Sequence, residues 1–338
     1  MMTLKISIDP GSSATKVTYQ IGQQPIQCFA MSPFCARVPT DYANNRWSHE
    51  KDKIQLESSW VNVDDTTFLL GRAAQKYYDS ELKNSERKFT KALYKVLAIL
   101  SYVQLREKVE LPIELGILLP FDEYATKAQL QSELWRFDGD LIYFCEDFQP
   151  LEFKDILIRP EGAGLFLRGL SSKVNLQDSR IAILVIGHRN VSWLVMNNGA
   201  PSPSESITND LGFRWMLQEV QSLSGFKDEL ALAEMIVHRQ NIPPDMETII
   251  STVLTQYWEQ LRFFLQAQAP TDGVVCGGGA AWALKEQLTE FFPQRLGWAN
   301  HLARAVQKRQ IKDKDKALAQ RMADCYGLLL SMGASDHE

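Results

Sequence analysis

Alternating apolar and polar positions predict a pair of strands at the start of the chain. Leu4, Ile6 and Ile8 alternate with polar residues, and residues 17–19 continue as a second strand after a polar turn. Residues 24–31 extend the same pattern as a third strand. The chain therefore opens with a strand, a turn and a returning strand, as in the edge of an antiparallel sheet.

The same order of elements recurs in the second half of the chain. Residues 181–186 form a continuous apolar run typical of a buried strand, and a polar turn at 187–190 precedes a partner strand at 191–196. The Asn197-Asn198-Gly199 segment that follows is a strong hairpin signal. We therefore expect two similar lobes, the first built from residues 1–160 and 313–338 and the second from residues 161–312.

Helical periodicity and short apolar runs predict the remaining elements. We expect helices at about 86–105 (capped by Ser85), 126–134, 165–170 and 316–332. Two further helices should begin near residues 212 and 243, and another should end at residue 288. Further strands are expected at 60–63, 67–70, 113–119, 141–145, 156–158 and 274–276. Residues 32–60 lack a pattern and are expected to form a surface insertion with a mobile loop.

Residues 9–16, between the first two strands, combine the groups that a charged ligand requires. Asp9 ends a strand and can hold a metal ion through water, and Gly11 lets the backbone approach an anion. The small polar residues and the cation of this turn are Ser12, Ser13, Thr15 and Lys16. Taken alone, the segment is interpreted equally well as an ordinary hairpin with a polar turn.

Two later segments add glycines at strand ends. One is the Gly187-His188-Arg189-Asn190 turn, and a glycine at Gly212 precedes the next helix. The other is Gly277-Gly278-Gly279-Ala280, where glycines let backbone N–H groups face a ligand or let a helix pack closely. Three such turns at strand ends, in both predicted lobes, favour a binding site over three unrelated hairpins.

Composition narrows the class of protein. The chain has 338 residues, 45% of them hydrophobic and 23% charged, with a net charge of −5, so it lacks the global basic surface of a nucleic-acid-binding protein. Its five cysteines are scattered and odd in number, which favours reduced thiols. No apolar run reaches the ~20 residues of a membrane helix, and no signal-peptide core follows Met1. We expect a cytoplasmic protein without membrane contact.

The order and spacing of the three turns resemble the actin-like ATPase superfamily. Residues 9–16 look like its first phosphate loop, residues 187–190 like its second, and residues 277–280 like its adenosine motif. Residues 161–164 and 323–327 are similar to its two interlobe connecting helices. The resemblance implies an α/β actin-like fold, with two duplicated ribonuclease-H-like lobes around a nucleotide cleft that takes ATP or GTP with Mg²⁺.

Within that superfamily, the chain most resembles bacterial and archaeal actin-like proteins of the ParM type. This rests on Lys16, on residues 68–74, and on Leu118-Leu119-Pro120 followed by Lys127. The resemblance implies self-association into a filament, in plasmid or DNA segregation or as a bacterial cytoskeletal element. A separate DNA-binding adaptor protein would then contact DNA, because this chain is acidic.

The second turn departs from the pattern of the family. The aspartate that usually opens it is replaced by Val185, and the closing aspartate by Ser192. Valine binds no Mg²⁺ and orients no water, so binding is expected more than efficient hydrolysis, and whether hydrolysis occurs stays open. Asp122 and Glu123 are candidate water-positioning acids alongside Asp9, although acids at the entry of a helix are an equally good interpretation.

Two alternatives to a filament protein remain at this stage. A scaffold or adaptor that binds nucleotide without hydrolysing it is favoured by Val185. A small-molecule kinase of the same superfamily would need a carboxylate that activates a hydroxyl, and none stands at the second turn. His188 and Arg189 either contact phosphate or form an exposed hairpin tip.

Overall fold

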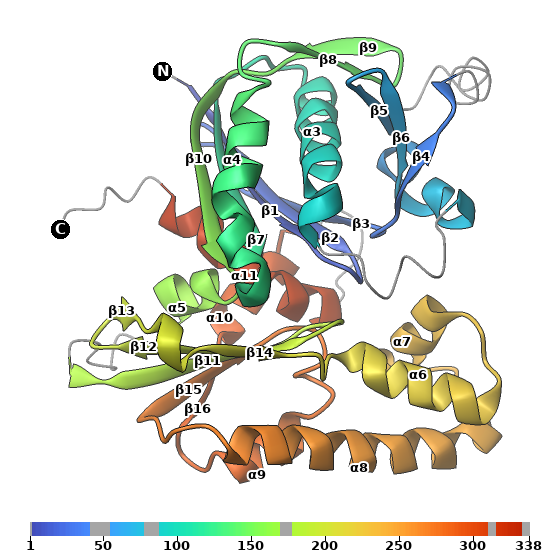
Figure 1. Ribbon diagram of the computed structural model, residues 1–338, viewed down its shortest axis with the longest axis vertical. Helices are drawn as coiled ribbons and strands as arrows, with labels where there is room; N and C mark the ends of the chain where they lie inside the picture. Colours follow the sequence, from blue (N-terminus) through green and yellow to red (C-terminus); the bar gives the residue numbers. More distant parts are fainter. Residues whose placement is uncertain (1, 41–54, 78–87, 170–177, 310–315, 333–338) are drawn as a thin grey trace. The chain divides into compact units, whose positions relative to one another are not determined.

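The computed structural model describes residues 2–40, 55–77, 88–169, 178–309 and 316–332, and the chain divides into two compact units (Figure 1). The first unit comprises residues 1–160 with 332–338, and the second comprises residues 161–331. Mixed sheets and helices make up both units, so the α/β class is confirmed.

The first unit is built on a five-stranded sheet with the order β10-β7-β1-β2-β3. The expected opening hairpin is confirmed, because β1 and β2 pair antiparallel and β2 pairs in turn with β3. On its other side β1 pairs parallel with β7, which pairs parallel with β10. The bounds are β1 (Leu4–Pro10), β2 (Thr15–Ile21), β3 (Gln27–Met31), β7 (Ile113–Leu119) and β10 (Phe153–Pro160).

A second, antiparallel sheet in this unit has the order β4-β6-β5-β8-β9. The expectation of an irregular 32–60 stretch is wrong for β4, because Cys35, Ala36 and Val38 are buried and the strand pairs with β6. The predicted mobile loop falls largely on residues 41–54, which lie outside the described residues. The bounds are β4 (Cys35–Val38), β5 (Trp60–Val63), β6 (Thr66–Leu70), β8 (Leu141–Phe144) and β9 (Asp147–Pro150), the last of which was not predicted.

The core of the first unit lies around α3 (Lys88–Glu107). Its Val96, Leu97 and Leu100 are fully buried in one cluster with apolar residues of both sheets. The expected cap at Ser85 lies outside the described residues. The other helical segments of this unit are η1 (Leu56–Ser58), η2 (Gly71–Tyr77), η3 (Phe121–Thr126) and α4 (Lys127–Trp135).

The second unit repeats the strand plan of the first, which confirms the expected duplication. Its sheet has the order β13-β12-β11-β15-β16, with β14 pairing on β12. As in the first unit, an antiparallel hairpin, here β11–β12, has a parallel strand on its other side. The bounds are β11 (Arg180–Ile186), β12 (Val191–Asn197), β13 (Ala200–Pro201), β14 (Ile207–Asn209), β15 (Gly273–Gly277) and β16 (Leu296–Trp298).

Helices cover both faces of this sheet (Figure 1). On one face, α6 (Phe213–Ser224) and α8 (Pro244–Gln266) form the apolar cluster together with the strands of the sheet. On the other, α5 (Ala163–Gly169) packs against β15 and α11 (Lys316–Ser331). The remaining helical segments are η5 (Pro203–Glu205), α7 (Glu229–His238), α9 (Lys285–Phe291) and α10 (Asn300–Gln307).

Two glycines bring α5 and α11 together backbone to backbone. A Cβ at Gly164 would collide with the carbonyl of Asp324, and one at Gly327 would collide with the carbonyl of Gly164. The helices can approach this closely only because neither carries a side chain at the contact. Helix α11 therefore groups with the second unit, whereas the sequence-based division placed residues 313–338 in the first lobe.

A carboxylate from α11 caps α5 at the same contact. Asp324 accepts N–H hydrogen bonds from Gly162 (2.6 Å), Gly164 (2.8 Å) and Leu165 (3.1 Å). These are N–H groups at the start of a helix, which have no partner within the helix itself. The two segments that resemble connecting helices are thus joined by packing and by hydrogen bonds.

Among the described residues, no helix combines the length and apolar character needed to span a membrane.

Candidate functional site

The first turn holds an ion pair between facing residues of the β1–β2 hairpin. Asp9 and Lys16 occupy directly opposite positions in the strand register. The Lys16 Nζ lies 2.5 Å from the Asp9 Oδ2, and Asp9 is only 6% exposed. A charge-assisted hydrogen bond compensates both groups for their partial burial. Strand pairing thus places a carboxylate and a cation side by side at the mouth of the turn.

The backbone of this turn is tightly closed at Gly11. A Cβ there would lie 2.6 Å from the carbonyl oxygen of Ala14, so any other residue would force the turn open. Ser12 is exposed and Ser13 is half-buried. Thr15 is fully buried, and its hydroxyl has no hydrogen-bond partner in the described part of the chain.

The β11–β12 hairpin reproduces this backbone plan in the second unit. The pair Val185–Ser192 stands at the register position that Asp9–Lys16 holds in the first hairpin, and four residues complete each turn. The Gly187 N–H donates to the carbonyl of Asn190 at 2.9 Å, and a Cβ on Gly187 would lie 3.0 Å from that same oxygen. A side chain is therefore excluded at the first position of the first turn, and at the first position of the second turn it would be in tight contact with the backbone.

The side chains at this equivalent position differ sharply. Val185 is 6% exposed, and its Cγ2 would lie 3.1 Å from a Cβ on Gly162. Ser192 shares a hydrogen bond of 3.0 Å with the Thr208 hydroxyl. The second hairpin thus has an apolar and a neutral residue where the first has an ion pair.

The start of α6 is bound to the second turn by its backbone. The N–H groups of Phe213 and Arg214 donate to the carbonyls of Gly187 (3.0 Å) and His188 (2.8 Å). A Cβ at Gly212 would collide with the backbone of Arg189, so glycine is required for this docking. The first amides of α6 are therefore used within the protein, and the structure gives Gly212 a packing role that its motif did not reveal.

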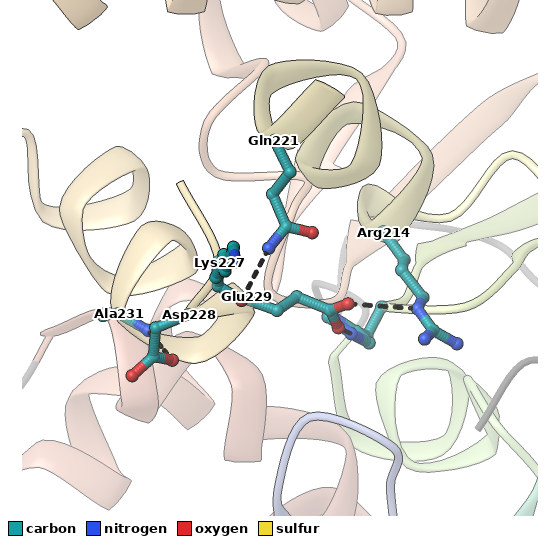
Figure 2. Close-up of polar contacts among 7 residues, drawn as sticks. Arg214, Gln221, Lys227, Asp228, Glu229 and Ala231 are labelled. Atoms are coloured by element: carbon teal, nitrogen blue, oxygen red, sulfur yellow. Dashed lines mark hydrogen bonds and ion pairs between the residues drawn. The ribbon is translucent and has the colours of Figure 1, made fainter. Parts of the chain in front are cut away.

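A partly buried cluster of charges lies beside the same turn. The Glu229 carboxylate, at the start of α7, lies 2.9 Å from the His188 Nε2. It also lies 3.3 Å from the Arg214 Nε (Figure 2). Burial alone would raise the pKa of Glu229, but the hydrogen bonds and charges of His188 and Arg214 together outweigh it and hold the pKa below its usual value. The side chain of His188 is thus held by a partner and is not an exposed hairpin tip. No sequence signal pointed to Glu229.

The glycine run lies beside the second turn. Val185 of β11 and Gly277 of β15 are neighbours in the parallel register, and the Ala280 N–H donates to the carbonyl of Ile186 at 3.4 Å. Gly278 has a φ of +93°, a conformation that favours glycine. Residues 278–284 form successive turns before α9 begins, so the helix that was expected to follow the run directly starts later. The second unit thus brings together residues 187–190, Gly212 and residues 277–280.

The two candidate acids after β7 have different surroundings. Glu123 is 1% exposed, and its Oε2 accepts a 2.9 Å hydrogen bond from the Phe89 N–H at the start of α3. This contact satisfies a helix N-terminus, so a structural role for Glu123 has direct support. Asp122 is exposed on η3. Within the described ranges, no group of three or more His, Cys, Asp or Glu side chains is placed to hold a metal ion.

Two units with one strand plan, each with a glycine turn in its first hairpin, define the actin-like fold. Solved structures agree, although no protein-family model and no curated protein matches the sequence. ParM from Bacillus thuringiensis with ADP is 14% identical at a TM-score of 0.67, with 97% of this chain and 98% of that chain covered. An archaeal actin homologue, Ta0583, is 14% identical at a TM-score of 0.64, with 97% and 98% covered. The Alp12 filament structure is 15% identical at a TM-score of 0.59, with 97% of each chain covered. The predicted fold is thus confirmed.

Proposed function

We propose that this chain is a nucleotide-binding actin-like protein that assembles into filaments. The observation that carries the proposal is the matched pair of glycine turns, one at the end of each first hairpin, with a glycine run beside the second. Such turns bring backbone N–H groups close to an anion, as a phosphate requires. The likeness to an ADP complex of ParM and to an Alp12 filament supports both parts of the proposal.

The residues present fit a nucleotide with its metal ion. In the first unit, Lys16 would hold phosphate oxygens, together with the backbone at Gly11, Ser12 and Ser13, whereas the fully buried Thr15 hydroxyl would stay behind them. Asp9 would hold Mg²⁺ through water, and the ion would neutralise phosphate charge when bound. In the second unit, His188, Arg189 and Asn190 would contact phosphate, and residues 277–280 would lie against the nucleoside.

Calorimetry and sedimentation test the two parts separately. We expect the purified chain to take up ATP or GTP with Mg²⁺, and to pellet as filaments visible by electron microscopy when a nucleotide or a slow analogue is present. Assembly into an open filament requires a head-to-tail contact that does not close into a ring. Uptake of neither nucleotide in calorimetry would refute the binding proposal. Binding that leaves only monomers in every nucleotide state would refute assembly.

A nucleotide-binding scaffold without hydrolysis is the second candidate. It is favoured by Val185, which presents no oxygen at the position where the first hairpin has Asp9. Phosphate-release assays on the wild-type chain and on Asp9→Ala distinguish the candidates. Release by the wild type that is lost in the variant supports an ATPase, whereas intact binding with no release from either supports the scaffold.

Plasmid or DNA segregation, or a bacterial cytoskeletal role, is the setting that we propose for such a filament. The net charge of −5 favours a separate DNA-binding adaptor protein over direct DNA contact. A cytoplasmic location follows from this setting. Gel-shift assays with the chain alone are expected to show no DNA binding at physiological salt, and tight binding would contradict the adaptor proposal.

A further inference from the structure

Glu229 connects three segments of the second unit through two short contacts. It is the first residue of α7, and its carboxylate bridges His188 in the turn and Arg214 in the first turn of α6. The side chains of His188, Arg214 and Glu229 are 8%, 15% and 28% exposed. Charge-assisted hydrogen bonds at such partly buried sites are screened by water less than surface contacts are, so they constrain the groups that they join more.

Hydrogen bonds on both sides of Glu229 hold the backbone at the start of α7 in place. The Ala231 N–H donates to the Asp228 Oδ1 at 3.1 Å, which caps the helix, and the Gln221 Nε2 donates to the carbonyl of Lys227 at 3.0 Å (Figure 2). The second bond ties the segment before α7 to α6. The carboxylate therefore reaches the turn from a backbone that is anchored on both sides.

The turn, α6 and α7 are thus joined to one another, each pair by at least one hydrogen bond. The turn is bonded to the α6 backbone through Phe213 and Arg214, and α6 is bonded to the segment before α7 through Gln221. The third connection is the hydrogen bond between Glu229 of α7 and His188 of the turn. The turn is therefore connected to α7 in two ways: through the α6 backbone, and directly through Glu229. Only the Glu229 connection uses a side chain of the turn.

We propose that Glu229 is a positioning residue for a phosphate-bearing ligand at the turn 187–190, and that it links the state of that turn to α7. The proposal rests on the proposed nucleotide function. Glu229 acts by orienting the His188 ring and the Arg214 guanidinium, and it touches no ligand itself. Its negative charge also lowers the positive potential at the turn, so removing the charge and removing the orientation have opposite effects on an anion.

Two variants of Glu229 separate orientation from charge. Glu229→Gln removes the charge but retains atoms that hydrogen-bond to both partners, whereas Glu229→Ala removes charge and contacts together. We expect the Kd for ATP with Mg²⁺ to rise about tenfold in the alanine variant, and to stay within about threefold of wild type in the glutamine variant. Glu234→Ala, at an exposed position of the same helix, is the matched control and is expected to leave the Kd unchanged.

A double variant tests whether the effect passes through His188. If it does, His188→Ala combined with Glu229→Ala loses less than the sum of the two single variants, because the part of the Glu229 effect that passes through His188 is already lost in His188→Ala. Additive losses would overturn that part of the proposal. Tighter binding by both Glu229 variants would show a purely electrostatic role and overturn it, as would lower stability of the alanine variant with an unchanged Kd.

Hydrogen exchange of the nucleotide-free protein keeps the inference separate from the proposed function. Amides of residues 187–190 and of the start of α6 should exchange about tenfold faster in Glu229→Ala than in Glu234→Ala, with Glu229→Gln close to wild type. Unchanged exchange there would overturn the positioning role even if the wild type binds nucleotide. Absence of nucleotide binding by the wild type would refute the proposed function, and faster exchange would still establish that Glu229 orders the turn.

Discussion

Asp324 is the residue whose removal should most sharply disturb the second unit without touching its glycine turns. Asp324→Ala removes a carboxylate that accepts three N–H bonds at the start of α5, from Gly162, Gly164 and Leu165. All three of these residues are buried, so water does not readily take the place of the lost acceptor. The variant thus leaves a buried helix N-terminus with unpaired donors.

The magnitude follows from the number of bonds and their burial. Each buried donor left unsatisfied costs about 1–3 kcal/mol, so three donors at the lower end of that range give a loss of at least about 3 kcal/mol for Asp324→Ala. Asp324→Asn retains one oxygen in the place of the Oδ1 that accepts from Gly164 and Leu165, and presents an NH₂ group to Gly162. It should therefore cost only about 1–3 kcal/mol.

Thermal unfolding and hydrogen exchange measure this effect. For a unit of this size, 3 kcal/mol corresponds to a fall of about 6–12 °C in the melting temperature of the second unit. The amides of Gly162, Gly164 and Leu165 should lose protection first. Glu290→Ala, at an exposed position of α9, controls for the loss of a negative charge. A melting temperature and amide protection equal to wild type in Asp324→Ala would refute the capping role.

Four further predictions concern single residues. Lys16→Ala should weaken nucleotide binding by tenfold or more in calorimetry, about 1.4 kcal/mol, because it removes the cation of the first turn. Gly278→Ala should cost about 2–4 kcal/mol in urea unfolding, since its Cβ would meet backbone at a φ of +93°, whereas Gly199→Ala, at +81° in open space, should cost only about 1–2. The depressed pKa of Glu229 means that its ion pairs stabilise fully above about pH 4.5 and lose this contribution as the pH falls below that value, so the melting-temperature gap between wild type and Glu229→Gln should shrink from pH 6 to pH 3. Burial raises the pKa of Cys145 to about 12, so iodoacetamide should label it slowly in the folded chain and rapidly in urea.

Most of the fold could be predicted because its strands carry their own signal. The β1–β2 and β11–β12 hairpins have buried alternating or continuous apolar runs, and the fold-level repeat followed from them. Strand β4 was missed because it is only four residues long and becomes ordered through β6, more than 25 residues away in the chain. Helix α7 was missed because its start is defined by contacts with the turn and α6. Short elements that depend on distant partners leave little local pattern.

The candidate site was predictable at the level of its turns and not at the level of its contacts. At Gly11 and Gly278 a Cβ would collide with the backbone, and at Gly187 it would be in tight contact with it, so their motifs reflect a local constraint. The ion pair of Asp9 with Lys16 follows from strand register. The contacts of Glu229 and Asp324 bridge separate helices, and such pairings depend on tertiary packing that no local pattern encodes.

Both hairpins have close main-chain contacts at the glycine of the turn, and the shape of the hairpin does not depend on which side chains its strands carry. Each hairpin keeps its shape through main-chain closeness at its glycine, whether the strands below carry an ion pair or a valine and a serine. One of the two hairpins can therefore lack the charged pair and still have the same backbone register. An acid in place of Val185 would meet the same hairpin backbone, but it would be buried opposite the neutral Ser192, whereas Asp9 stands opposite Lys16.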